Sequence, residues 1–243
     1  MKNIVILGAT SGIAEQAARL YAADACRLLL VARNASHLEE IAADLRVRGA
    51  DHVHCLVSDL ADVEAMPRLA ADIAAQMPSV DALWIAHGTL PDEAACQRDP
   101  SLTAQTLIVN GLSPVLLVSH LLNQSGLTLS KLVVLSSVAG DTGRPSIATY
   151  GSAKAMLSYY LTAMHRAGST DRTAVYLIKP GVVKTRMTAH LQHGLLSAEA
   201  PAVAAKIRRI VETRGPGSYY VPSIWWLVMM VVRHMPAMVL RRL

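Results

Sequence analysis

Tyr150 and Lys154 stand four residues apart, and both side chains can exchange a proton. On a helix, side chains at this spacing share one face. A phenol has an ordinary pKa of ~10 and is a poor base at neutral pH unless its anion is stabilised. An adjacent ammonium group stabilises that anion, and a pKa lowered by ~3 units corresponds to roughly 4 kcal/mol. We therefore predict an acid–base pair in which Lys154 lowers the pKa of Tyr150.

Ser137 precedes Tyr150 by thirteen residues and follows the apolar run 132–135. A hydroxyl at the carboxyl end of a strand points into the crevice where open α/β sheets bind ligands. Ser137 is predicted to polarise a carbonyl group while Tyr150 gives it a proton. The Tyr–Lys spacing alone also fits the surface face of an ordinary helix. Chance becomes a poor explanation once the serine and the glycine turn described next are added.

A glycine-containing turn, Gly8–Ala14, follows the first apolar run and opens a helix-like segment. Gly8 permits a tight turn, and Gly12 allows the backbone to approach a pyrophosphate. The free N–H groups at the start of the helix favour the phosphate charge. An ordinary tight turn is the alternative, but the position after an amino-terminal strand favours dinucleotide binding. The turn residues predicted to contact the cofactor are Gly8, Thr10, Ser11 and Gly12.

The second apolar run ends at Ala32 and is followed by Arg33. An NAD-preferring site usually places an acid about 20 residues beyond the glycines, bonded to the ribose 2′-hydroxyl. Ala32 removes that acid, and the planar cation of Arg33 suits a 2′-phosphate. The pair indicates NADP(H), with a solvated surface arginine as the alternative. Asp59 and Leu60 follow the third run and are expected at the adenine edge, although Asp59 also fits the N-cap of the next helix.

The elements that position these residues alternate between short apolar runs and amphipathic stretches. The runs show little alternation of polarity, which is typical of strands buried on both faces: 4–7, 28–32, 53–57, 82–86, 132–135, 175–178 and 219–221. Helix-like segments lie at 13–23, 36–48, 62–76, 101–123, 151–167 and 199–213. This pattern predicts an α/β fold of the Rossmann type: a doubly wound, mainly seven-stranded parallel sheet with helices on both faces. We expect a single domain over residues 1–221, followed by a tail over 222–243.

Composition excludes several classes of protein. The chain has 243 residues, of which 52% are hydrophobic and 17% charged, so it is neither disordered nor fibrous. Its three cysteines show no metal-ligand spacing and do not form a disulfide framework, so we expect no metal site and a reducing, cytoplasmic compartment. The first apolar run, 4–7, is too short for a secretory signal. The sequence shows no basic stripe with interleaved aromatic residues, so we expect no nucleic-acid partner.

The positive charge is concentrated at the carboxyl-terminal end. Residues 1–202 hold 16 basic and 17 acidic residues, whereas 203–243 hold 7 basic residues and one acid. The apolar run 224–232 contains Trp225 and Trp226 and is too short to span a bilayer, which takes ~20 residues. It fits an interfacial helix with both tryptophans at the headgroup level, at the inner face of a membrane. Packing on the domain or on a second subunit of a homo-oligomer is the alternative.

The motifs together resemble those of the short-chain dehydrogenase/reductase family, and the resemblance covers residues 3 to about 221. Its elements occur in order: the Gly8–Ala14 turn, Ile85-Ala86-His87-Gly88, Asn110, Ser137, Tyr150, Lys154 and Pro180-Gly181-Val182-Val183-Lys184-Thr185. The resemblance implies that Asn110 supports a water relay to Lys154 and that Lys154 also holds the nicotinamide ribose. It further implies that the cofactor is lined by Ile13, Ala86, Gly88, Pro180, Gly181, Val183 and Thr185. Ala14 replaces a family glycine, which should alter packing more than phosphate contact. Ala86-His87 replaces Asn-Ala beside the cofactor, which puts the contacts of these two residues in doubt.

A narrower resemblance concerns the segments 183–191 and 231–236, together with the basic end Arg241-Arg242. They look like the corresponding parts of decaprenyl-phosphoryl 2-keto-ribose reductases, which implies a keto-sugar carried on a polyprenyl phosphate. The sequence thus predicts hydride transfer between NADP(H) and a carbonyl or alcohol. The alternatives are reduction of a soluble carbonyl compound with the tail as an oligomer or core element, a sugar epimerase or dehydratase, and a non-catalytic NADP(H)-binding sensor. The chain lacks room for the second domain of the epimerases, and a sensor would usually have lost Tyr150 or Lys154.

Overall fold

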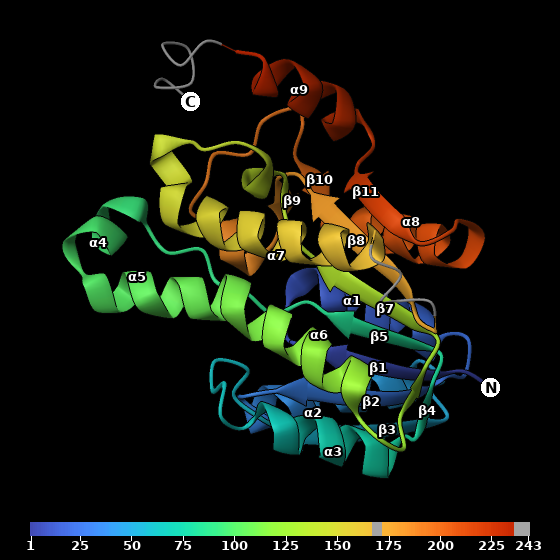
Figure 1. Ribbon diagram of the computed structural model, residues 1–243. Helices are drawn as coiled ribbons and strands as arrows, with labels where there is room; N and C mark the ends of the chain where they lie inside the picture. The colour runs from blue at the N-terminus through green and yellow to red at the C-terminus, as the bar shows by residue number, and fades with distance from the viewer. Residues whose placement is uncertain (167–171, 236–243) are drawn as a thin grey trace.

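The computed structural model describes residues 1–166 and 172–235. Its centre is a sheet of seven parallel strands in the order β11-β8-β7-β5-β1-β2-β3 (Figure 1). The bounds of these strands are β1 Asn3–Leu7, β2 Arg27–Ala32, β3 His52–Val57, β5 Ala82–Ile85, β7 Lys131–Leu135, β8 Ala174–Pro180 and β11 Gly217–Val221. Each strand begins within two residues of the start of a predicted apolar run. The predicted fold class, including the seven parallel strands, is confirmed.

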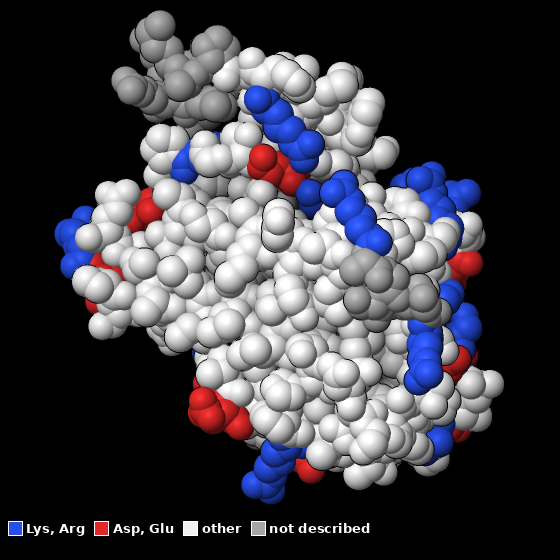
Figure 2. Space-filling view, viewed as in Figure 1, with Lys and Arg blue, Asp and Glu red and all other residues white. Residues whose placement is uncertain are grey.

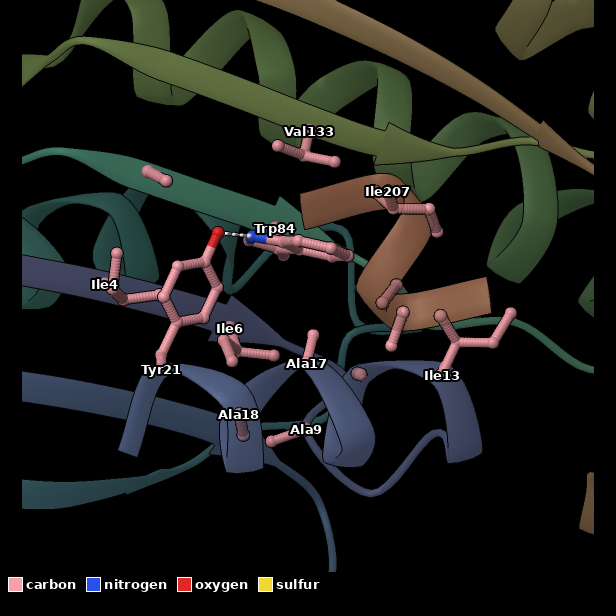
Figure 3. Close-up of a cluster of buried hydrophobic side chains, with 14 of the residues drawn as sticks. Ile4, Ile6, Ala9, Ile13, Ala17, Ala18, Tyr21, Trp84, Val133 and Ile207 are labelled. Carbon is pink, nitrogen blue, oxygen red and sulfur yellow. Dashed lines mark hydrogen bonds between the residues drawn. The ribbon is translucent and has the colours of Figure 1, made fainter. Parts of the chain in front are cut away.

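Successive side chains of the central strands enter two different cores because residues in a strand point alternately to opposite faces. Ile4 and Ile6 of β1 belong to one buried cluster, and Val5 and Leu7 belong to the other. Helices α1, α2 and α8 cover the first face, and α3, α6 and α7 cover the second. Figure 3 shows the first core, where the Trp84 indole meets Tyr21 edge-on and donates a hydrogen bond to its hydroxyl oxygen at 3.4 Å.

The helices follow the predicted amphipathic segments, with shifts at their ends. Their bounds are α1 Gly12–Ala22, α2 Ala35–Val47, α3 Met66–Gln76, α4 Glu93–Arg98, α5 Pro100–Leu107, α6 Ser113–Asn123, α7 Ala148–Arg166, α8 Ala200–Thr213 and α9 Ile224–Arg233. The predicted segment 101–123 is interrupted by a π-helical turn, η1 Ile108–Leu112. The predicted end of 151–167 lies outside the described residues. Helix α3 starts at Met66 instead of 62, because Asp59 and Asp62 hold the preceding residues in turns.

Several short elements were not predicted from the apolar runs. Helix α4 is one, and the others are the 3₁₀ turns η2 Val138–Asp141, η3 Pro145–Ile147 and η4 Arg186–Thr188. Two small strand pairs flank the main sheet: β4 Ser79–Val80 with β6 Thr128–Leu129, and β9 Val183–Lys184 with β10 Ala198–Glu199. These elements of two to six residues are too short to carry a periodic signal.

The order of the strands determines where on the sheet a ligand can bind. From β1 the chain proceeds through β2 and β3 toward one side of the sheet, and from β5 it proceeds through β7, β8 and β11 toward the other. Ligands of such sheets bind at this switch point, beyond the carboxyl ends of the strands. Among the described residues, the stretch Pro100–Asn123 is long and apolar enough to cross a membrane by length and composition, but α5 and α6 pack on α7 in the fold.

Candidate active site

A cleft of about 700 Å³ opens at the carboxyl ends of the parallel strands. The residues that were predicted to contact a dinucleotide all line it: Gly8, Thr10, Ser11, Gly12, Ile13, Arg33, Asp59, Leu60, Ala86, Gly88, Tyr150, Lys154, Pro180, Gly181, Val183 and Thr185. Ser137 lines the same cleft, whereas Asn110 is fully buried behind it. Residues from seven separate segments of the sequence therefore meet at one edge of the sheet.

The glycine turn is shaped by close contacts that a side chain would prevent. Gly8 has φ +79°, and a Cβ atom there would lie 2.6 Å from the backbone nitrogen of His87. A Cβ atom on Gly12 would lie 2.9 Å from Cγ2 of Thr185 across the cleft. Ser11 is the N-cap of α1 and makes no side-chain capping bond, which leaves first-turn N–H groups for a ligand. The turn thus offers a phosphate both space and donors.

Arg33 and Ala32 lie where the sequence placed them. Ala32 is buried at the end of β2, and Arg33 is exposed at the rim of the cleft. Within the described part of the chain, no ion pair or hydrogen bond engages the Arg33 side chain, so its charge is available to a ligand. Asp59 also lines the cleft, and its Oδ1 accepts a hydrogen bond from the Ala61 backbone at 3.0 Å. The alternative role of Asp59 as a helix N-cap is wrong, because Ala65 caps α3.

Tyr150 and Lys154 lie one turn apart near the start of α7, with the Lys154 Nζ 5.9 Å from the centre of the Tyr150 ring. Burial raises the pKa of Tyr150 above its ordinary 10.0, and a hydrogen bond to Ser137 acts in the opposite direction. Burial lowers the pKa of Lys154 from 10.5 to about 8. The predicted lowering of the Tyr150 pKa is therefore wrong for this state of the cleft, because desolvation of the phenolate outweighs its stabilisation. Tyr150 is a protonated phenol that can donate.

Ser137 stands at the end of β7 and caps the 3₁₀ turn η2. Its Oγ accepts a hydrogen bond from the Ala139 backbone at 3.1 Å. The neighbouring Ser136 also lines the cleft, and its Oγ lies 2.7 Å from the Ser158 hydroxyl on α7. These bonds fix the loop after β7 to α7, so that the Ser137 and Tyr150 hydroxyls face one another at the cleft.

Asn110 lies in the π-helical turn η1, an irregularity that often occurs at functional sites. Its Oδ1 accepts from the Thr89 backbone at 3.1 Å, and its Nδ2 donates to the Thr106 carbonyl at 2.9 Å. Lys154 donates to the Leu135 carbonyl at 3.1 Å. The Asn110 side chain thus ties the segment that follows β5 to the end of α5. The water relay between Asn110 and Lys154 stays a prediction.

His87 is a site residue to which the sequence analysis assigned no role. The signal that could have identified it is that histidine stands here in place of a small residue of the family. Ser113 donates its hydroxyl proton to the Leu60 carbonyl, so the 2.9 Å contact between Ser113 Oγ and His87 Nε2 has the imidazole as donor. Nδ1 is then a bare acceptor, buried and without a partner among the described residues. Burial and the charge of Lys154 lower the pKa of His87 to about 3. His87 is a neutral imidazole beside the glycine turn.

Two further residues of the cleft, Arg144 and Trp225, were not predicted as site residues. Trp225 was expected at the level of lipid headgroups together with Trp226. Instead it lines the cleft and lies against Gly181, where an added Cβ would fall 1.9 Å from the indole nitrogen. Trp226 on the next position of α9 is 59% exposed. The reason is geometric: adjacent residues of a helix point about 100° apart, so the two rings cannot share one environment.

The inner face of α9 is fixed to the loop after β7 by a charged cluster around Asp141, whose side chain is 2% exposed. Its carboxylate accepts bonds from Lys179 of β8 at 2.6 Å and from the Tyr220 hydroxyl of β11 at 2.6 Å. Arg233 of α9 lies 2.9 Å from the same carboxylate. Because Asp141 ends the turn that begins beside Ser137, the start of the tail is part of the structure around the site. Arg241 and Arg242 lie outside the described residues.

Comparison with known proteins agrees with this geometry. The family model described as short chain dehydrogenase matches residues 2–195. An uncharacterized oxidoreductase of Mycobacterium tuberculosis is 32% identical over 99% of this chain and 96% of its own length. A dehydrogenase/reductase SDR family member 7B of Bos taurus is 29% identical over 76% of this chain and 59% of its own length.

Solved structures show the same fold. A short chain dehydrogenase from Shigella flexneri complexed with NADP has a TM-score of 0.78 at 21% identity, over 90% of this chain and 95% of that one. A short-chain type dehydrogenase/reductase from Mycobacterium ulcerans also has a TM-score of 0.78, at 17% identity, over 90% and 88% of the two chains. The family match covers most of the sequence and includes Ser137, Tyr150, Lys154 and the glycine turn. The chain therefore belongs to the short-chain dehydrogenase family and is an oxidoreductase of that family.

Proposed function

We propose that this protein is an NADP(H)-dependent reductase that transfers hydride between the nicotinamide and a carbonyl or alcohol substrate. The observation that carries the proposal is the meeting of Ser137, Tyr150 and Lys154 with the glycine turn in one cleft. A non-catalytic sensor would have no need of a buried phenol and a buried ammonium group, since burying each costs free energy.

The shape of the cleft fits a dinucleotide. A Cβ atom on Gly8 or Gly12 would fill the space in which a pyrophosphate approaches the backbone, and the first turn of α1 offers its N–H groups there. Gly8, Ser11 and Gly12 would hold the pyrophosphate, with Thr10 and Ile13 beside them, and Asp59 and Leu60 would contact the adenine. Lys154 would hold the nicotinamide ribose. When bound, the nicotinamide supplies or accepts the hydride.

The preference for NADP(H) rests on Arg33. Its guanidinium stands at the cleft rim without a described partner, and the buried Ala32 provides no carboxylate to bind a ribose 2′-hydroxyl. A 2′-phosphate would give Arg33 a planar, charge-assisted contact. A dianionic phosphate would meet no acid on residue 32, whereas NADH would leave Arg33 unpaired.

The protein's own groups divide the proton chemistry among them. Ser137 orients the substrate oxygen through its hydroxyl, and Tyr150, which burial keeps protonated, donates a proton to that oxygen during reduction. Lys154, with a pKa of about 8, carries a positive charge at neutral pH and stabilises the phenolate that is left. In the oxidative direction the same hydroxyl takes the proton back.

For the substrate, we propose as a narrower possibility the polyprenyl-phosphate-linked keto-sugar suggested by the tail sequence. The supporting observation is an exposed apolar face of α9, on the helix whose Trp225 lines the cleft. Figure 2 shows a largely white surface over α9, with basic and acidic side chains beside it. This face would lie on a membrane surface and consists of Ile224, Trp226, Leu227, Met230 and Val231.

The test of the proposed function is oxidation of NADPH by the purified protein, followed by absorbance, with a panel of aldehydes, ketones and keto-sugars. We expect carbonyl-dependent oxidation with at least one of them and a smaller rate with NADH. Tight NADPH binding without oxidation by any carbonyl, and without NADP+ reduction by the matching alcohols, would contradict the reductase proposal and favour the sensor.

A further inference from the structure

Among the described residues that line the cleft, one cation has neither a counter-charge nor a role assigned above. The lining holds four basic residues and a single acid, Asp59, which lies at the expected adenine end. Arg33 and Lys154 are assigned to the cofactor and to catalysis. Arg186 donates to the Thr10 carbonyl at 3.2 Å and contacts His37 Nε2 at 2.8 Å. The fourth is Arg144, on the loop between η2 and Tyr150.

Arg144 is half-buried between Gly143 and Pro145, and its Nε is buried without a hydrogen-bond partner. Burial alone lowers the pKa of Arg144, with no carboxylate acting in the opposite direction. A guanidinium has donors only and cannot lose its proton to relieve this cost. Buried polar groups in native proteins nearly always have a partner, so an unpaired Nε on a residue that lines the cleft indicates that the partner arrives with a ligand.

A second orphaned donor belongs to another residue that lines the cleft. The Trp225 indole nitrogen is buried and has no acceptor within residues 1–166 and 172–235. An indole N–H usually finds a partner when it is buried. Gly181 makes room for this indole, and the Asp141–Arg233 ion pair at 2.9 Å holds the helix that carries it. Neither Arg144 nor Trp225 can accept a hydrogen bond, so the complementary group must be an acceptor, and the charge of Arg144 favours an anion.

The position in the sequence separates this pair from the cofactor phosphates. Arg144 follows Ser137 and precedes Tyr150, the two hydroxyls that hold the reacting oxygen, whereas the pyrophosphate cradle is built by Gly8 and Gly12 at the start of α1. We propose that Arg144, with Trp225, binds an oxyanion carried by the substrate, either a carboxylate or a phosphate ester. This inference rests on the proposed function and specifies its substrate as an anionic carbonyl compound.

The experiment compares matched anionic and neutral carbonyl compounds with the NADPH-loaded, full-length protein. One pair is dihydroxyacetone phosphate and dihydroxyacetone, and the other is 4-oxopentanoate and its methyl ester, so the two arms distinguish phosphate from carboxylate. We expect kcat/KM of the wild type to favour the anionic member of at least one pair by about tenfold or more. In Arg144→Gln this ratio should fall close to one, whereas Arg144→Lys should keep part of the preference because it keeps the charge. Trp225→Phe should lower the ratio several-fold.

Arg68→Gln is the matched control, because Arg68 is an arginine on α3 whose side chain is 88% exposed. It should keep the wild-type ratio. A second readout needs no turnover: inorganic phosphate should raise the Tm of the NADPH-loaded wild type above that in chloride at equal ionic strength, and should not do so for Arg144→Gln.

Three results would overturn the inference. They are equal kcat/KM for the members of both pairs, an unchanged ratio in Arg144→Gln, and a loss of NADPH affinity in Arg144→Gln that accounts for the whole effect. Turnover without any charge preference would refute only the oxyanion site. Stabilisation by phosphate that depends on Arg144, in a protein that reduces no carbonyl, would support the anion site and contradict the reductase.

Discussion

Replacement of Arg33 by alanine tests how the adenosine end of the cleft selects its cofactor. A charge-assisted contact of an arginine with a phosphate contributes ~1.5–3 kcal/mol. Arg33 is exposed at the cleft rim, so water and salt screen its charge and the lower part of that range applies. We expect Arg33→Ala to raise the Kd for NADPH by about 10- to 30-fold, since tenfold corresponds to ~1.4 kcal/mol. The Kd for NADH should change less than about twofold.

The assay is a titration of both cofactors, followed by fluorescence, at low and at high salt. The wild type should bind NADPH more tightly than NADH, and this difference should shrink at high salt. Arg68→Ala serves as the control for the loss of one positive charge elsewhere. Equal affinity of the wild type for the two cofactors would refute the reasoning, as would an Arg33→Ala protein in which both affinities fall by the same factor.

Three further predictions concern other parts of the structure. His87 has a pKa of about 3 in the fold against an ordinary 6.5, so the unfolded chain binds the extra proton between these values. The unfolding free energy should therefore fall as the pH drops through this window, by up to ~1.4 kcal/mol per pH unit, and His87→Gln should reduce that slope in urea denaturation; an unchanged slope would refute the burial of a neutral imidazole. Gly181→Ala should displace the Trp225 indole, lowering kcat/KM and shifting the tryptophan emission of a folded protein, because its Cβ would lie 1.9 Å from the indole nitrogen; wild-type values of both would contradict this packing. The protein should float with anionic vesicles in a salt-dependent way, and Trp226→Ser with Leu227→Ser should abolish flotation; flotation of this double variant would exclude the outer face of α9 as the contact.

The frame of the fold was predictable because it depends on a repeated alternation of apolar runs and amphipathic segments. The apolar runs of the inner strands are buried on both faces, so their boundaries follow directly from composition, as 28–32 does for β2. The edge strands β3 and β11 were expected to be buried in the same way, but they are partly exposed because each has a neighbouring strand on one side only. The glycine turn and the Tyr150–Lys154 spacing were predictable because each needs specific residue types at fixed positions. All of the expected cofactor residues line one cleft for that reason.

The remaining features depend on contacts between distant segments, for which single-sequence patterns carry no signal. The neutral state of His87 follows from its burial and from the charge of Lys154, far along the chain, and the raised pKa of Tyr150 follows from how completely the fold buries it. Trp225 differs from Trp226 only through the direction each takes from α9. The ion pair between Asp141 and Arg233, which fixes that direction, joins residues far apart in the chain.

The central claim is that Tyr150 donates the proton in an NADPH-dependent reduction. Its most direct test is a single-turnover measurement, in which wild type and Tyr150→Phe are loaded with NADPH and mixed with the carbonyl compound that the wild type reduces fastest. The phenylalanine keeps the ring and removes the transferable proton. We expect NADPH to bind both proteins with similar affinity and the rate of NADPH oxidation to fall by at least ~10²-fold in Tyr150→Phe. A wild-type rate in Tyr150→Phe would contradict the assignment.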